Sequence, residues 1–418
     1  MITTTQLPEV LTQLGATAVN ARQDRKRSIS STNVRFEKDG RRGVAVAASR
    51  KVDAAVTRAP INAFTDLVDL HLRSADDRLS RDDVWLWFAE RPDDLETEVA
   101  FRTLARNLRG LRVHIRVITG GESGPWALQE LPDDLLPWND LDHYRYSRWP
   151  GLLAAVPEEP PALVTDLVKA TGRCEYRAYP MLSSGGRDWS IRFEGLQVGV
   201  VMATKGWFDV GRVHGDGRTS HHRKRWVGVA GDERIEVGAS NVNQVATILQ
   251  KFAAAESAMG GQDEHALESR ILRGAVSLTS PTADAPLELI RPHPVVNWGS
   301  QFPTRWGVRN GAARYLDGIL RDGRTPWALE MKVAGGSGEQ YYRHAVHQAV
   351  LYRDFIRGAT PLAGWFDRFD LDQAVCEAAV VVPVIEDPEA EGRLRALAAR
   401  FGVHLIVVPV AAALRPQP

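Results

Sequence analysis

The spacing of apolar residues along the chain predicts a mixed α/β structure. In the first part, residues 42–48 and 84–88 are short and largely apolar, as is typical of buried strands. Residues 96–109 instead repeat apolar side chains at helical spacing, and 111–119 is a further strand-like run. Strand, helix and strand joined by short loops predict a β-α-β unit.

The pattern changes to short strands within residues 163–256. Residues 189–193 alternate between apolar and polar, and 241–255 carry apolar residues on one face of a predicted helix. A solvated loop and a loop that contacts phosphates explain the basic stretch 215–226 equally well. The basic residues of this stretch are Arg218, Arg223, Lys224 and Arg225.

The third part begins with a predicted helix at 263–274, for which Gly274 is a suitable C-terminal stop. Residues 313–320 form an apolar run interrupted by a single Asp, and 327–333 form a second strand. The Asp-Gly turn between them predicts a hairpin. The elements expected after it are a helix at 339–357, a strand at 378–385, a helix at 389–401 and a strand at 403–410.

Two polar stretches divide these parts of the chain. Residues 156–163 are rich in Pro and Glu, and residues 257–263 are polar and contain glycine, as linkers do. The domains that we expect are an N-terminal α/β domain at 1–155, a β-rich middle domain at 156–258 and an α/β domain at 259–418.

Composition narrows the classes of partner. The 418 residues include 52 Lys and Arg against 52 Asp and Glu, so any affinity for nucleic acid must come from local basic patches. The two cysteines, Cys174 and Cys376, can form neither a disulfide framework nor a cysteine-rich zinc site. The N-terminal residues lack a signal-peptide pattern, and no apolar run approaches the ~20 residues of a membrane span. We therefore expect a cytoplasmic protein without membrane contact.

Candidate chemistry gathers in the hairpin of the third domain. In the strand at 327–333, Ala328, Glu330 and Lys332 share one face because side chains alternate, and the hairpin can bring Asp317 onto that face. Charges on an inner strand are costly unless they pair with one another or bind a metal. An ion pair accounts for Glu330 and Lys332 but leaves Asp317 as surplus charge. Two carboxylates and a main-chain carbonyl would instead suit Mg²⁺ or Mn²⁺.

The helix at 339–357 carries a polar stripe. Gln340, His344, Gln348 and Tyr352 recur every four residues and so lie on nearly one face of the helix. A polar stripe on a core-facing helix suggests a ligand. The glycine run before the helix lacks the Gly-Lys-Ser/Thr of a P-loop, and His344-x-x-His347 lacks a further ligand at metal spacing in the helix.

These residues resemble the PD-(D/E)XK nuclease superfamily. A helical Glu268, Asp317 in a hairpin strand, the Glu330-Met331-Lys332 strand and the helical Gln348-x-x-x-Tyr352 stand in the family's order, and the last motif is similar to the RecB-like branch. The resemblance covers residues 263–410 and implies a restriction-endonuclease-like α-β-β-β-α-β core, a mixed sheet flanked by helices. Leu316 replaces the family's proline, and Glu330 stands where RecB-like members usually have Asp.

The resemblance implies a role for each residue of the hairpin. Asp317 and Glu330 would hold Mg²⁺ or Mn²⁺ together with the main-chain carbonyl of Met331. Lys332 would be the catalytic lysine, and Glu268 would assist metal or water binding.

The resemblance also implies a nucleic-acid-binding role for the helix at 339–357, where Gln348 and Tyr352 would position the backbone of the substrate. His344 and Gln340 of the same stripe join them as binding candidates, as do the four basic residues of the loop at 215–226.

The leading hypothesis is a metal-dependent nuclease that hydrolyses phosphodiesters with a metal-activated water and leaves 5′-phosphate and 3′-hydroxyl ends. We favour DNA over RNA and an endonuclease over an exonuclease. By analogy we favour anti-phage defence or restriction over DNA repair, with a homodimer or a partner subunit as the assembly to test. The alternatives are a non-catalytic nucleic-acid-binding or sensing protein on a nuclease scaffold, and activation by a nucleotide bound to the N-terminal domain.

Overall fold

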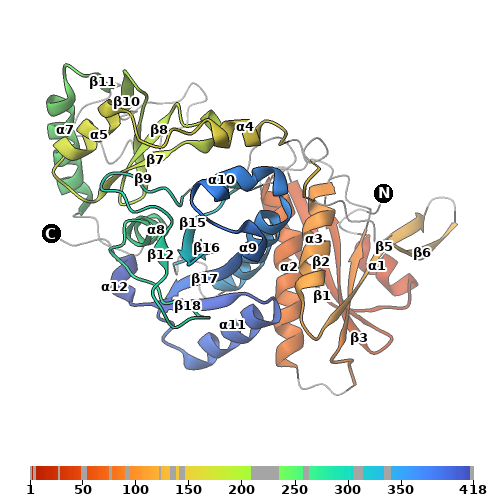
Figure 1. The fold of residues 1–418 in the computed structure, drawn as a ribbon. Coiled ribbons are helices and arrows are strands. Elements are labelled where there is room, and N and C mark those ends of the chain that lie inside the picture. The colour runs from red at the N-terminus through yellow and green to blue at the C-terminus, as the bar shows by residue number, and fades with distance from the viewer. Residues whose placement is uncertain are drawn as a thin grey trace.

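The computed structural model describes residues 2, 6–26, 29–48, 54–74, 78–89, 95–121, 124–131, 138–140, 146–208, 235–257, 263–300, 302–304, 314–333 and 340–414. Within these ranges the chain is a mixed α/β protein with three sheets of five or six strands and one two-stranded ribbon (Figure 1). None of the helices in these ranges has the length and apolar character that crossing a bilayer requires.

The N-terminal sheet contains six strands in sequence order, β1 to β6. The central strands β3, β4 and β5 are parallel, and the outer pairs are antiparallel. Helices α2 and α3 connect the parallel strands, so the predicted β-α-β unit is confirmed. The elements are α1 (Leu7–Gln13), β1 (Thr17–Lys26), β2 (Ile29–Lys38), β3 (Arg41–Ala48), α2 (Ala54–Arg73), β4 (Asp83–Phe88), α3 (Leu95–Asn107), β5 (Arg112–Gly121) and β6 (Gly124–Glu130).

The middle sheet is antiparallel throughout, in the order β11-β10-β9-β8-β7. A parallel bridge from Ala178 to Val296 joins it to the C-terminal part of the chain. The basic residues Arg218, Arg223, Lys224 and Arg225 lie outside the described residues. The elements are α4 (Trp149–Ala154), α5 (Ala162–Ala170), β7 (Tyr176–Pro180), η1 (Leu182–Ser184), β8 (Trp189–Phe193), β9 (Leu196–Val201), β10 (Gly206–Phe208), β11 (Ile235–Val237) and α7 (Val242–Ser257).

The C-terminal sheet has the order β12-β15-β16-β17-β18. Strands β12, β15 and β16 are antiparallel neighbours, whereas β16, β17 and β18 are parallel. With α8 ahead of the strands and α9 between β16 and β17, the elements of this sheet follow as helix, three strands, helix, strand. The elements are α8 (Glu264–Leu272), β12 (Glu288–Leu289), β15 (Gly318–Asp322), β16 (Thr325–Met331), α9 (Gln340–Gly358), β17 (Glu377–Pro383), α11 (Pro388–Arg400) and β18 (His404–Val408).

The strand expected at 313–320 is divided in two. Its first part, β14 (Arg314–Tyr315), pairs with β13 (Pro303–Thr304) in the separate ribbon, and β15 begins only at Gly318. Leu316 donates its amide to Phe302, so the chain changes partners there. The smaller remaining elements are η2 (Thr360–Leu362), α10 (Ala363–Arg368), η3 (Gln373–Val375) and α12 (Val410–Ala413).

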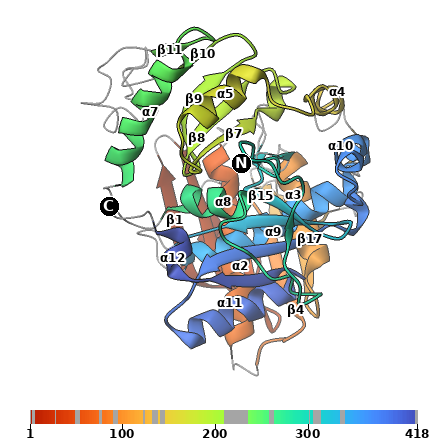
Figure 2. The same ribbon diagram turned by 60° about the vertical axis from the view of Figure 1, so that its left-hand side comes forward.

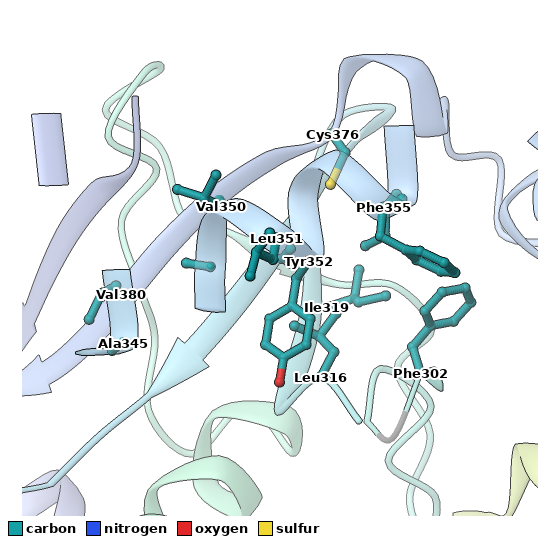
Figure 3. Close-up of a cluster of buried hydrophobic side chains, with 14 of the residues drawn as sticks. Phe302, Leu316, Ile319, Ala345, Val350, Leu351, Tyr352, Phe355, Cys376 and Val380 are labelled. Carbon is teal, nitrogen blue, oxygen red and sulfur yellow. The ribbon is translucent and has the colours of Figure 1, made fainter. Parts of the chain in front are cut away.

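Helix α9 lies between the C-terminal sheet and helices α2 and α3 of the N-terminal part (Figure 1). Its apolar side chains, among them Ala345, Val350 and Phe355, pack in a cluster that includes Leu316 and Ile319 (Figure 3). This one buried cluster continues from Val44 to Leu405 and includes residues of all three sheets. We therefore expect the three parts of the chain to support one another's folding, because none of them has a separate core of comparable extent.

The two faces of β16 pack into different clusters. Ala328 belongs to the cluster beneath α9, whereas Leu329, Met331 and Val333 belong to a second cluster with α8 and α12. This alternation confirms the two faces predicted for residues 327–333.

Candidate active site

The hairpin of β15 and β16 brings the predicted acidic residues together. Its turn is tight, with Asp322 opposite Thr325 and Gly323 in the left-handed region at φ 56°. This register places Gly318 opposite Leu329, so the residue before β15, Asp317, reaches the end of β16. The amide nitrogen of Met331 donates to Asp317 Oδ2 at 2.8 Å.

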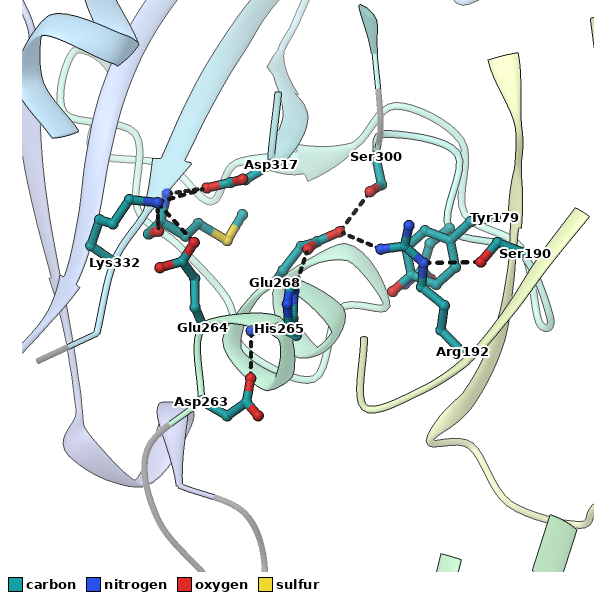
Figure 4. Close-up of polar contacts among 12 residues, drawn as sticks. Tyr179, Ser190, Arg192, Asp263, Glu264, His265, Glu268, Ser300, Asp317 and Lys332 are labelled. Carbon is teal, nitrogen blue, oxygen red and sulfur yellow. Dashed lines mark hydrogen bonds and ion pairs between the residues drawn. The ribbon is translucent and has the colours of Figure 1, made fainter. Parts of the chain in front are cut away.

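Lys332 lies at the centre of the cluster (Figure 4). Its Nζ is 2.7 Å from Glu330 Oε1, 2.8 Å from Glu264 Oε1 and 3.7 Å from Asp317 Oδ2. The same nitrogen donates to the carbonyl oxygen of Met331 at 2.8 Å. Because the Lys332 side chain is only 6% exposed, this single ammonium offsets one of the three negative charges that the surrounding carboxylates can carry.

Glu264 is a member of the cluster that the sequence analysis missed. It stands one helical turn before Glu268 on α8, and residues four apart lie on the same face of a helix. That spacing is the signal that could have identified it. Asp263 begins the helix by accepting the amide of His265 at 2.8 Å, and this cap fixes the first turn that carries Glu264.

Helix α8 is held in place by the turn between β8 and β9 (Figure 2). In this turn the buried Glu194 forms ion pairs with Arg270 at 2.8 Å and with Arg273 at 2.9 Å. The next residue, Gly195, has φ 76° and lies so close to the His265 carbonyl that a Cβ atom would overlap it. The middle domain therefore positions the acidic face of α8.

Glu268 has partners of its own beside the lysine cluster (Figure 4). Ser300 donates to Glu268 Oε1 at 2.6 Å, and Arg192 NH1 lies 3.7 Å from the same oxygen. His265 Nδ1 is 3.8 Å from Glu268 Oε2, and interaction with this carboxylate raises the pKa of His265. Neither Arg192 nor Ser300 could be identified from the sequence, because both reach Glu268 only through tertiary packing.

The surplus of carboxylates perturbs the protonation of the cluster. Burial and then the charge of Glu330 raise the pKa of Asp317 well above its ordinary value, against the opposing effect of Lys332. For Lys332, burial favours the neutral amine, but the charges of Glu330, Asp317 and Glu264 outweigh burial and raise its pKa. The lysine is therefore a permanent cation, and Asp317 holds its proton more tightly than an ordinary aspartate.

The donor set fits a hard divalent cation. Asp317, Glu330 and the Met331 carbonyl offer three oxygens at one place, and Mg²⁺ and Mn²⁺ prefer carboxylate and carbonyl oxygen. As the side chains stand, no group of three or more His, Cys, Asp or Glu within the described ranges is arranged to hold a metal ion. Glu330 and Asp317 face the ammonium of Lys332, so a metal would require these side chains to turn from it.

Two residues of the polar stripe on α9 have different partners. Tyr352 contacts the chain just before the hairpin, and Gln348 contacts its own helix. Tyr352 is 3% exposed and donates its hydroxyl to the carbonyl of Tyr315 at 3.1 Å, two residues before Asp317. Gln348 is half-buried, and its side chain donates to the His344 carbonyl at 3.4 Å. Gln340 is the first residue of α9, and its side chain is outside the described part.

His344 of the stripe and the neighbouring His347 face the N-terminal domain. His344 Nε2 is 3.3 Å from Asp66 Oδ1, and His347 Nδ1 is 3.1 Å from Thr65 Oγ1, both on α2. Burial opposes the ionisation of Asp66, but the hydrogen bond from His344 and nearby positive charge lower the pKa of Asp66 overall. His344 thus has a partner within the protein, and its binding of nucleic acid stays a prediction.

Comparison of the chain with models of protein families, with curated proteins and with solved structures found no match. The candidate function therefore rests on the geometry of the cluster.

Proposed function

We propose that the protein is a metal-dependent nuclease of the PD-(D/E)XK type. The observation that carries the proposal is the meeting of Asp317, Glu330 and Lys332 at the ends of two paired strands, opposite the acidic face of α8. The order of elements around the C-terminal sheet, helix, three strands, helix and strand, is the order expected of that superfamily's core. Tyr352 of the Gln-x-x-x-Tyr motif donates its hydroxyl to the carbonyl of Tyr315 in β14, the strand just before this hairpin.

Each residue has a role in the proposed reaction. Asp317 and Glu330, with the Met331 carbonyl, would hold Mg²⁺ or Mn²⁺, which polarises a phosphoryl oxygen and lowers the pKa of a bound water when present. Lys332 supplies a fixed positive charge beside the position of the scissile phosphate, where negative charge increases in the transition state. Glu268, which accepts a hydrogen bond from Ser300, would orient a water or accept its proton.

The substrate that we propose is nucleic acid, DNA rather than RNA, cut internally to leave 5′-phosphate and 3′-hydroxyl ends. A role in anti-phage defence or restriction rests on the analogy of a nuclease domain joined to separate recognition domains. A homodimer or a partner subunit would bring a second site to the other strand of a duplex.

One observation favours a second candidate, a non-catalytic nucleic-acid-binding protein. Lys332 already contacts Glu264 and Glu330 directly, so the cluster can persist as a structural ion network without metal. A protein that uses the domain only as a scaffold would keep such a network for stability.

Cleavage assays distinguish the two candidates. Plasmid, single-stranded DNA and RNA are incubated with wild type, Asp317→Ala, Lys332→Ala and the control Asp166→Ala, which changes an exposed carboxylate of α5. The nuclease predicts cutting with Mg²⁺ or Mn²⁺ but not with EDTA, retained by the control and lost by both site variants. Cutting that survives both site variants would place the chemistry elsewhere. Binding without cutting by any variant would favour the scaffold.

A further inference from the structure

A cavity of about 220 Å³ lies between the middle sheet and the C-terminal ribbon, next to the candidate active site. Tyr179, Ser190 and Arg192 line it from strands β7 and β8, and Leu182 from η1. Its lining also includes Gln197 and Tyr315, which are both exposed to solvent and so stand at its opening.

Two contacts connect the cavity to the proposed catalytic residues. Arg192, which lines the cavity, has NH1 3.7 Å from Glu268 Oε1 (Figure 4). Tyr315 precedes Asp317 by two residues, and its carbonyl accepts the hydroxyl of Tyr352 at 3.1 Å. A ligand in the cavity would therefore lie beside the phosphodiester that the proposed nuclease cuts.

The polar part of the lining is buried and fixed in position. The guanidinium of Arg192 stacks over the ring of Tyr179 at 4.5 Å from its centroid, and its Nε donates to Ser190 Oγ at 3.2 Å. Tyr179 accepts from Asn297 at 2.9 Å, and burial raises the pKa of Tyr179 to about 12, so its ring stays neutral. Arg192 and Ser190 are 9% and 1% exposed. Such groups can recognise a ligand without first losing conformational freedom.

Charge and size decide which ligand class the cavity suits. Arg192 is the one charged residue among the described residues that line it, and Glu268 offsets that charge. A phosphate would require more positive charge, whereas a neutral ligand with a hydrogen-bonding edge would not. The volume is below the ~300–1,000 Å³ typical of pockets that enclose whole drug-sized ligands, which favours a single ring system.

We propose that this cavity binds one unstacked nucleobase of the substrate, adjacent to the scissile phosphodiester. Tyr315 at the opening supplies an aromatic face for stacking, and Gln197 and Ser190 supply donors and acceptors for the edge of the base. Nucleic acid is taken as the ligand from the proposed function. The cavity would then give the nuclease a preference for the base beside the cut, and Arg192 would connect recognition to Glu268.

Binding of the four deoxynucleosides to full-length protein in EDTA tests this without requiring cleavage. Saturation-transfer NMR would be recorded for wild type, Tyr315→Ala, Gln197→Ala and Gln244→Ala. Gln244 is an exposed glutamine on α7, away from the cavity, and serves as the matched control. Inorganic phosphate is the competitor that identifies an anion site.

We expect saturable binding of at least one nucleoside to wild type and control, weakened about fivefold or more in both cavity variants. No saturable binding at millimolar nucleoside would overturn the proposal, as would binding that both cavity variants retain or that phosphate displaces. If nucleosides bind as expected while the enzyme cuts no substrate, the proposed function fails and the base-binding cavity stands. If the enzyme cuts its substrate but no nucleoside binds, only the proposal of a base-binding cavity fails.

Discussion

Replacing Lys332 by Met separates a metal site from a structural ion network. The change keeps the apolar stem but removes a charge that contacts Glu330 at 2.7 Å and Glu264 at 2.8 Å. Glu330 is 2% exposed and would stay buried without its cation, and breaking a buried pair costs roughly 3–5 kcal/mol. Because the Glu264 and Asp317 side chains are 28% and 21% exposed and can rehydrate, we expect the low end of that range, about 3 kcal/mol.

A divalent cation should recover much of this loss. Metal at a hundred times its dissociation constant stabilises the folded state by about 2.7 kcal/mol if it binds only that state. Urea unfolding followed by circular dichroism, in EDTA and in Mn²⁺, measures both effects. The exposed Lys251→Met on α7 is the control, with an expected change within about 0.5 kcal/mol. A loss below about 1 kcal/mol, or no recovery with Mn²⁺, would refute the reasoning.

Three further changes test separate contacts. Because the pKa of Asp317 is raised, metal binding should release a proton, and metal affinity should increase with pH. Calorimetry in two buffers of different ionisation heat measures this release, and an equal heat of metal binding in both buffers would contradict it. Glu264→Gln keeps an acceptor for Lys332 but removes its charge, and should weaken metal affinity about 10- to 100-fold in a Mn²⁺ titration, whereas unchanged affinity would exclude Glu264 from the site. Arg343→Met removes a 3.0 Å contact with the buried Asp69, which keeps its ion pair with Arg73 at 2.9 Å. We therefore expect the free energy of unfolding in urea to decrease by about 1–3 kcal/mol. No decrease would mean that this contact contributes little to the packing of α9 on α2.

The same raised pKa sets the sign of a stability effect in metal-free protein. A carboxyl that holds its proton more tightly when folded stabilises the fold at low pH, and this contribution is lost as pH rises through its folded-state value. Asp317 therefore makes the folded state less stable as the pH rises above the ordinary pKa of an aspartate. A carboxylate in an ordinary ion pair has the opposite effect.

The core of the candidate site followed from local rules. Strand alternation predicts that Glu330 and Lys332 share a face, and the Asp-Gly turn fixes the register that brings Asp317 beside them. These relations involve residues close in the chain, so the sequence alone specifies them.

The surroundings of the site depended on packing that no local pattern specifies. Arg192 reaches Glu268 from the middle sheet, and Glu194 anchors α8 from the same hairpin. The polar stripe on α9 indicated a ligand, but His344 of the stripe contacts α2 of the N-terminal domain, as does the neighbouring His347. Periodicity shows which face of a helix is polar; it does not show what covers that face.

The location of a bound metal is the measurement closest to the central claim. Anomalous scattering from crystals grown with Mn²⁺ would locate the ion directly. The proposed nuclease predicts a peak bonded to the carboxylates of Asp317 and Glu330 and to the Met331 carbonyl, and no peak there in Asp317→Asn. A wild-type map without that peak, in which Lys332 still holds both Glu330 and Glu264, would contradict the nuclease and identify the cluster as a structural ion network.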